Sequence, residues 1–321
     1  MSTSAVPAAT ELTAPNELSR GLLGAAVAVT AWGASSVIAK VLPQSGLVIA
    51  AYRFMTYFLV IGLFRASRRQ FLTWHAFKHS IPGGLLLAAD VAFFFTAIKL
   101  TTVVNATIIG ALQPLILTIY GVRFLGERVR RSDIVLGTVA LAGVIVIVLA
   151  GSNSGDANIW GDLAALGALA SWSAYFVFAK RASGVVSPAD YTLAAALIVA
   201  MTNAPLALAF GQSLAWPAWN DWFWLFGMAL GAGILGHNMM NWSIVRIPLW
   251  LGSTMTLLVP VMSSAIAWIF LDEPLNATQI IAMFIALLAI GVLVRAQAAP
   301  RPATATATET ETATATENSV S

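Results

Sequence analysis

The chain has 321 residues, of which 59% are hydrophobic and only 10% are Asp, Glu, Lys or Arg. Soluble domains carry about 25% charged residues, so a soluble globule of this size would lack the charges to cover its surface. The composition therefore excludes a soluble protein and indicates an integral membrane protein. A helix that crosses a hydrocarbon core of about 30 Å needs about 20 apolar residues, and the chain has room for ten.

Apolar stretches of about membrane length follow one another along the chain, most of them free of charged residues. We expect one spanning helix within each of residues 21–39, 46–64, 81–98, 100–122, 134–155, 159–179, 191–220, 222–245, 247–271 and 274–294. These stretches are continuously apolar and do not alternate with a period of two, which excludes the strands of a porin-like barrel. The predicted fold class is all-α integral membrane.

Both ends of the chain differ from its apolar middle. Residues 1–18 and the Ala/Thr/Glu-rich residues 298–321 have the composition of disordered segments. We expect the ordered chain to divide into residues 19–151 and 159–297. The sequence has no cysteine, which excludes disulfides and thiolate metal sites. We expect no metal and no cofactor. We also expect no nucleic-acid partner, because the basic residues are placed at helix ends and form no single face.

The distribution of lysine and arginine predicts the orientation in the membrane. With ten helices, alternate loops share a side, and fourteen of the seventeen basic residues then fall on one side. The other side holds two, Lys40 and Lys99, and Arg53 lies inside a span. Cytoplasmic loops carry the excess of positive charge, so both termini are predicted to be cytoplasmic.

The two halves of the chain repeat one another. In residues 31–40 and 171–180, five of ten positions match, including Trp32 with Trp172 and Lys40 with Lys180. Two further pairs recur in the same order at nearly one offset, Asp90 and Lys99 with His237 and Arg246, and Pro114 and Glu127 with Pro260 and Glu273. Each repeat has five helices, an odd number, so the second must enter the membrane from the opposite side. Inverted repeats are typical of secondary transporters.

The matching segments also resemble a known family. Ala31–Gly33 with Lys40, Tyr52–Phe54, Gln113–Pro114 and the segments ending in Glu127 and Glu273 are similar to the ten-helix, two-repeat EamA type of the drug/metabolite transporter superfamily. The resemblance spans roughly residues 20–296 and is greatest to bacterial exporters of amino acids, including aromatic ones, and of metabolites. It implies a multi-pass protein of the inner (plasma) membrane. It also implies a central cavity formed mainly by the third, fourth, eighth and ninth helices.

Two ionisable side chains occupy equivalent positions near the middle of spans. Asp90 lies in the third expected helix and His237 in the eighth, with Asn238 and Asn241 beside it. A charge at this depth is costly and is expected to face protein or water. We expect Asp90 and His237 to approach one another, either as a substrate or proton site or as a polar pair that holds the two helices together.

Other candidates lie near the two prolines. Asn105 and Gln113 are predicted to share a face of the fourth helix, and Thr254 is near Pro260 in the ninth. Pro114 and Pro260 are predicted to break their helices and to free carbonyl groups for a ligand or for packing.

Aromatic and basic residues complete the candidate site. Trp172 and Tyr175 are predicted either to line a cavity or to pack. Arg53 has three alternatives: it reaches the interface, pairs with a loop, or binds a substrate carboxylate. The four residues predicted to act as gate or helix-end cations are Lys40, Lys99, Lys180 and Arg246.

These features predict an exporter of amino acids or related small amphipathic metabolites that works by alternating access. An exporter of drugs and organic cations is the alternative within transport. An integral-membrane enzyme is the alternative from another class, and we disfavour it because no dense polar constellation occurs. We therefore predict no catalytic residues, and partners limited to a small-molecule substrate and the lipid bilayer. The sequence leaves open whether the protein is a monomer or a dimer.

Overall fold

The computed structural model describes residues 15–100, 109–150, 158–272 and 274–298. The two tails expected to be disordered fall largely outside these ranges. All regular elements in the described ranges are helical, because a chain in hydrocarbon must satisfy its backbone N–H and C=O groups internally. The elements are α1 (Pro15–Val41), α2 (Gly46–Ser67), α3 (Trp74–Leu100), α5 (Gln113–Phe124), α6 (Arg131–Ala150), α7 (Ile159–Ala182), α8 (Pro188–Ala209), α9 (Trp219–Leu230), the π-helix η1 (Gly231–Asn238), α10 (Met239–Ile244), α11 (Leu249–Met255), α12 (Leu258–Phe270) and α13 (Ala277–Ala298).

Eight helical stretches in the described part of the chain are long and apolar enough to cross a membrane. They are α1, α2, α6, α7, α8, the run from α9 to α10, the run from α11 to α12, and α13. The third and fourth expected spans correspond to α3, which carries Asp90, and to the stretch that ends in α5. Residues 101–108 of that stretch lie outside the described residues.

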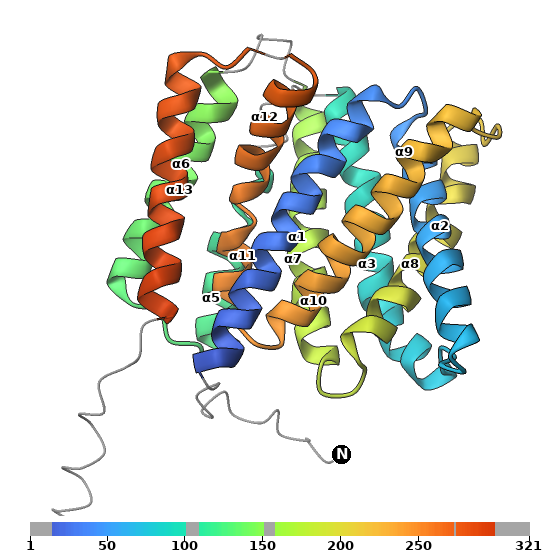
Figure 1. Ribbon diagram of the computed structural model, residues 1–321, viewed down its shortest axis with the longest axis horizontal. Helices are drawn as coiled ribbons and strands as arrows, with labels where there is room; N and C mark the ends of the chain where they lie inside the picture. The colour runs from blue at the N-terminus through green and yellow to red at the C-terminus, as the bar shows by residue number, and fades with distance from the viewer. Residues whose placement is uncertain (1–14, 101–108, 151–157, 273, 299–321) are drawn as a thin grey trace, which may run out of the picture.

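The helices pack in pairs that relate one half of the chain to the other. α3 packs along α7, whereas α1 packs along η1, α10 and α12; α2 packs along α8, and α6 along α13. Figure 1 shows α6 and α13 side by side at one edge of the molecule and α2 and α8 at the opposite edge. The contact of α1 with η1 and α10 thus mirrors the contact of α7 with α3, as a duplicated five-helix unit requires.

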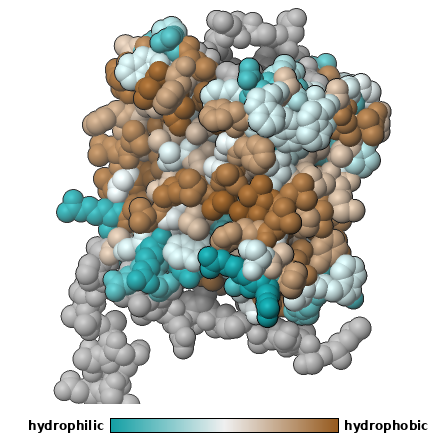
Figure 2. Space-filling model, turned by 45° about the vertical axis from the view of Figure 1, so that its right-hand side comes forward, coloured by the Kyte–Doolittle hydropathy of each residue, from teal (hydrophilic) through white to brown (hydrophobic). Residues whose placement is uncertain are grey.

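The surface of the bundle is apolar around its middle. Large side chains such as Leu63, Ile119, Phe223 and Phe284 expose more than 60% of their area, and Figure 2 shows hydrophobic residues across the middle of one face, with hydrophilic residues gathered toward its lower end. Exposed apolar area on this scale indicates contact with lipid.

Both ends of the described chain lie at the same end of the bundle. The start of α1 and the end of α13 are both at the bottom of Figure 1, together with the connections from α2 to α3 and from α7 to α8. We call this the inner end, because the count of basic residues predicts that it faces the cytoplasm, and the opposite end the outer end.

Candidate functional site

Arg53 of α2 contacts the first and eighth spans inside the bundle. Its Nη1 donates to Ser35 Oγ of α1 at 3.2 Å, and its Nη2 lies 3.3 Å from Nε2 of His237 in η1. The side chain also packs over the ring of Phe54, with 4.6 Å between the guanidinium carbon and the ring centroid. The guanidinium is thus fixed in place by neutral groups.

The contact with Arg53 determines the state of the His237 ring. A guanidinium has only N–H donors, so Nε2 must accept, and the imidazole is neutral with its proton on Nδ1. His237 is buried, and its Nδ1 has no hydrogen-bond partner among the described residues.

Four aromatic rings surround His237. The ring centroids of Trp32, Phe54, Trp172 and Tyr175 lie 5.2, 5.5, 6.2 and 6.4 Å from that of His237. The rings of Trp32 and Trp172, which are equivalent in the two repeats, meet edge to face at 5.3 Å. The aromatic residues therefore form a wall to which both repeats contribute side chains.

Asp90 of α3 lies near this cluster but is not bonded to it. It is half-buried, and its charge interacts with that of Arg53 and with the phenol of Tyr175. Within the described ranges, its carboxylate makes no hydrogen bond and no direct ion pair. The sequence predicts that Asp90 and His237 approach one another. In the structure it is Arg53 that contacts the imidazole of His237.

A π-helix presents His237 to Arg53. In η1, Gly233 and Gly236 face neighbouring spans so closely that a Cβ at either position would lie 2.3 Å from the Tyr57 ring or 2.5 Å from Trp32 Nε1. These glycines let α1 and α2 pack against the wider π turn. π-Helical turns inside α-helices occur frequently at functional sites.

Asn241 and Tyr175, both predicted to bind substrate, are bonded to each other. Asn241 Nδ2 donates to Tyr175 OH at 2.8 Å and to Thr192 Oγ1 at 3.0 Å, and all three residues are buried. Asn238 is half-buried in η1. The Asn241 bonds connect α10, α7 and α8.

The residues near the prolines lie at breaks between helices. Gln113 begins α5, directly followed by Pro114, and its Oε1 accepts from Thr256 Oγ1 at 3.2 Å, while its buried Nε2 has no partner in the described part of the chain. Pro260 is the third residue of α12, after the break that separates α12 from α11. Thr254 donates to the Trp250 carbonyl of its own helix at 2.8 Å. Asn105 lies outside the described residues.

Charged residues hold the connection between α10 and α11 at the inner end. Lys180 Nζ donates to the carbonyls of Ile244 and Ile247, the latter at 2.8 Å. The carboxylate of Glu127 accepts from the backbone N–H groups of Leu249 at 2.6 Å and Trp250 at 3.2 Å. We call Lys180, Glu127 and this connection the inner clamp.

The protonation of Glu127 and the contacts of Arg246 both affect the inner clamp. Burial raises the pKa of the Glu127 carboxyl above its ordinary value, an effect opposed by its two backbone hydrogen bonds and by the charge of Lys180. Arg246, in the clamped connection, donates to Glu17 of α1 at 2.9 Å and stacks on Trp242 at 3.8 Å.

The side chains of Lys40 and Lys99, the expected gate cations of the outer end, lie outside the described part of the structure.

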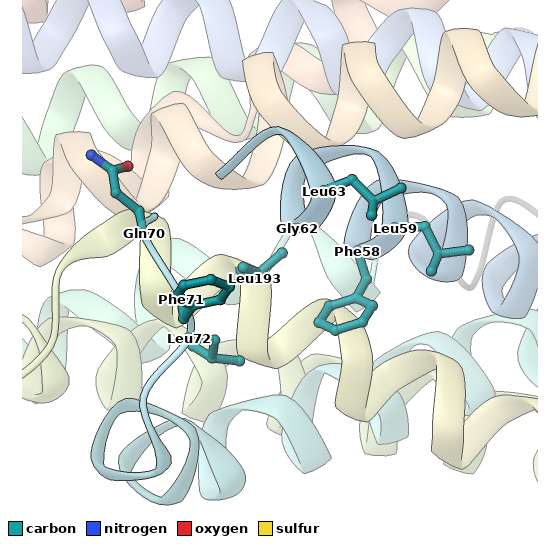
Figure 3. Close-up of a pocket in the computed structure, with 8 residues that line it drawn as sticks. All are labelled: Phe58, Leu59, Gly62, Leu63, Gln70, Phe71, Leu72 and Leu193. Carbon is teal, nitrogen blue, oxygen red and sulfur yellow. The ribbon is translucent and has the colours of Figure 1, made fainter. Parts of the chain in front are cut away.

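A shallow pocket of about 220 Å³ lies away from this site, on the outside of the bundle. It is lined by residues of α2, α8 and the connection after α2, and Figure 3 shows Phe58, Leu72 and Leu193 together in it while the amide of Gln70 points away from them. Neither Arg53 nor His237 lines it, and none of the four aromatic rings around His237 does.

Comparison with known proteins identifies the family. The model of the EamA-like transporter family matches residues 19–149 and again residues 159–295. The chain belongs to the EamA-like transporter family. This result confirms the resemblance to the drug/metabolite transporter superfamily and the prediction of a two-repeat, helical membrane transporter.

Similar members of the EamA family include several bacterial exporters. The aromatic amino acid exporter YddG of Ancylobacter novellus is 29% identical over 53% of this chain and 58% of that protein. The threonine/homoserine exporter RhtA of Escherichia coli (strain K12) is 24% identical over 62% of this chain and 65% of its own length. A probable amino-acid metabolite efflux pump of the same strain is 24% identical over 79% of this chain and 88% of that protein.

The first two alignments therefore cover only about three fifths of the relatives' own lengths. A crystal structure that is 21% identical has a TM-score of 0.71 and covers 86% of this chain and 98% of its own. That likeness shows that this EamA transporter shares its fold.

Arg53 is the central residue that the sequence alone did not select. A single arginine in an apolar span fits an interfacial position as well as a binding site, so its place in the sequence does not separate the alternatives. Ser35 and Phe54, which hold its side chain, carry no distinctive pattern either. A usable signal lies in the segment Tyr52–Phe54, which is part of the family resemblance.

Proposed function

We propose that this protein exports amino acids or related small amphipathic metabolites across the inner (plasma) membrane by alternating access. One observation carries the proposal: Arg53, His237 and the aromatic wall bring charged, polar and apolar groups together where four spans of the two repeats meet. Small-molecule sites are mostly apolar with a few convergent polar groups. The names of the similar exporters support the same substrate class.

The proposal includes ten crossings. α3 and the stretch that ends in α5 add two crossings to the eight apolar spans. The ten crossings form two inverted repeats, within residues 19–151 and 159–297. Both termini are cytoplasmic. The inner clamp supports alternating access, because it ties α7, the segment before α6, and the α10–α11 connection at one end of the bundle. We infer that these bonds hold the inner end closed and that they must break for substrate to enter from the cytoplasm.

Export of organic cations is the second candidate. Asp90, which has no bonded partner in the described part of the chain, favours it, because a carboxylate at this depth attracts a cation. Arg53 favours the amino acid, because its positive charge repels a cationic substrate that carries no carboxylate to offset it.

Growth of bacterial cells in the presence of a toxic amino-acid analogue tests the proposal. Cells that express the protein should tolerate p-fluorophenylalanine at a concentration several-fold higher than cells carrying an empty vector, and should accumulate less labelled phenylalanine. Protection against a cationic dye without any effect on amino acids would instead select the second candidate. A protein lacking activity on both would contradict the export proposal.

A further inference from the structure

Arg53 has more hydrogen-bonding capacity than its neighbours use. A guanidinium presents five N–H donors in a planar fork. The contacts with Ser35 and His237 use two of the five, and neither partner carries a negative charge. Among the described residues, nothing else accepts a hydrogen bond from this side chain.

Among the described residues, Asp90 is the acidic residue whose electrostatic interaction with Arg53 is resolved, and no direct bond joins the two. The protein thus holds a guanidinium and a carboxyl group near one another inside the bundle without a direct bond between them. An ion pair closed on itself would leave no charge to recognise a ligand. A guanidinium and a separate carboxyl group suit a ligand that carries both a carboxylate and an ammonium group.

We propose that the site binds its substrate as a zwitterion, with the substrate carboxylate on the guanidinium of Arg53 and the substrate ammonium at Asp90. Arg53 matches a carboxylate in geometry because the two planar groups can form parallel hydrogen bonds. The neutral ring of His237 and the hydroxyl of Ser35 are positioning groups that orient the guanidinium. This inference rests on the proposed function and specifies how the same site selects its substrate.

The assignment predicts discrimination by charge. A zwitterion gives each fixed charge a partner of opposite sign. A primary amine of the same shape leaves Arg53 without a carboxylate, and a carboxylic acid of the same shape leaves Asp90 without an ammonium. A buried charge that loses its partner is strongly disfavoured, so both analogues should bind much more weakly than the amino acid.

Competition in proteoliposomes tests this assignment on the unmodified protein. Uptake of labelled phenylalanine is measured against unlabelled phenylalanine, phenethylamine and 3-phenylpropionate. Phenylalanine should compete at a concentration at least tenfold lower than either analogue, which corresponds to about 1.4 kcal/mol. The series is repeated with leucine, isopentylamine and 4-methylpentanoate, so that the result does not depend on an aromatic ring. Equal competition by amino acid, amine and acid would overturn the zwitterion assignment.

Two variants then assign each charge to its group. Arg53→Gln should lose phenylalanine transport and shift the preference toward phenethylamine, and Asp90→Asn should shift it toward 3-phenylpropionate. Arg131→Gln and Asp272→Asn remove the same charges at exposed positions and should keep the wild-type order. If either site variant fails to fold, Arg53→Lys or Asp90→Glu replaces it, and each should weaken amino-acid competition several-fold.

The outcomes separate the inference from the proposed function. If the wild type transports amino acids but the two site variants show the same order of preference as the controls, the zwitterion assignment is wrong and the exporter proposal stands. If the wild type transports neither phenylalanine nor leucine but transports the amines, the exporter is one of organic cations, and the proposed function and the assignment both fail.

Discussion

At the scale of single residues, substitution of Asn241 distinguishes a structural role from a substrate-binding role. Its amide is buried and already donates to Tyr175 and Thr192. Asn241→Ala leaves two buried hydroxyls with lost partners, and we expect it to lower the free energy of unfolding by about 1–3 kcal/mol. Thermal unfolding in detergent measures this loss. Transport per folded molecule should stay close to that of the wild type.

Tyr175→Phe supplies the matched control for Asn241. If the bond between the two side chains carries the effect, the double variant should be less destabilised than the sum of the single variants. A large loss of transport in Asn241→Ala at unchanged stability would instead return Asn241 to the binding site.

At the scale of elements, the close packing of η1 predicts a contrast between two of its glycines. A Cβ on Gly233 would lie 2.3 Å from the Tyr57 ring, whereas one on Gly231 meets nothing within 4 Å. Gly233→Ala should therefore destabilise the protein by about 1–3 kcal/mol through overpacking, and Gly231→Ala should have little effect. Thermal unfolding of both variants checks the contrast, and equal melting temperatures would contradict the packing that the structure describes.

The inner clamp predicts a dependence on pH. The raised pKa of Glu127 means that the closed clamp binds a proton more tightly than an open one in which Glu127 faces water. Closure is thus favoured below the raised pKa, and opening is favoured as the pH rises through it. The sequence lacks cysteine, so a single cysteine at the buried Ser253 of α11 reports opening through its rate of labelling by a thiol reagent in nanodiscs.

A cysteine at the exposed Ser67 corrects for the pH dependence of the thiol itself. The ratio of the two labelling rates should rise with pH in the protein with Glu127 and should not change with pH in Glu127→Gln. Gln resembles the protonated form of Glu127 in carrying no charge, so the ratio in Glu127→Gln should stay near the low-pH value of the protein with Glu127. A ratio that rises with pH in both proteins would show that Glu127 is not the titrating group.

At the scale of the whole molecule, the proposed orientation can be tested with introduced cysteines. Single cysteines at Ser213 and Thr278 should react with an impermeant thiol reagent applied to intact cells. Those at Ser67 and Ser132 should react only after the membrane is made permeable. The reversed pattern would contradict the orientation inferred from the basic residues.

Much of the architecture was predictable because membrane helices are encoded by apolar length alone. The duplication was also visible, since Trp32 and Trp172 recur in matching segments and Pro114 and Pro260 precede matching glutamates. In the structure these prolines stand at the starts of helices that follow breaks, and not in the middle of kinked helices. The local sequence shows that a proline interrupts the hydrogen bonding of a helix, but it does not show at which residue the break occurs.

The centre of the site was less predictable, because it depends on contacts between distant segments. Asp90 and His237 were selected by their depth, but the sequence could not show that Arg53 would occupy the place beside the imidazole. The π-helix was also hidden, since one added residue in a turn leaves no mark in a continuously apolar segment. Tyr175 and Asn241 were expected to face a ligand, and their bond depends on the packing of α7 against α10.

Counterflow in proteoliposomes tests the central claim most directly. Vesicles containing the purified protein are loaded with unlabelled phenylalanine and diluted into a trace of labelled phenylalanine, with and without a proton gradient. An alternating-access amino-acid transporter should accumulate label transiently above the level of protein-free vesicles, and Arg53→Gln should abolish the accumulation while Arg131→Gln retains it. Absence of accumulation for phenylalanine, leucine and threonine alike, from protein that remains folded, would contradict the account.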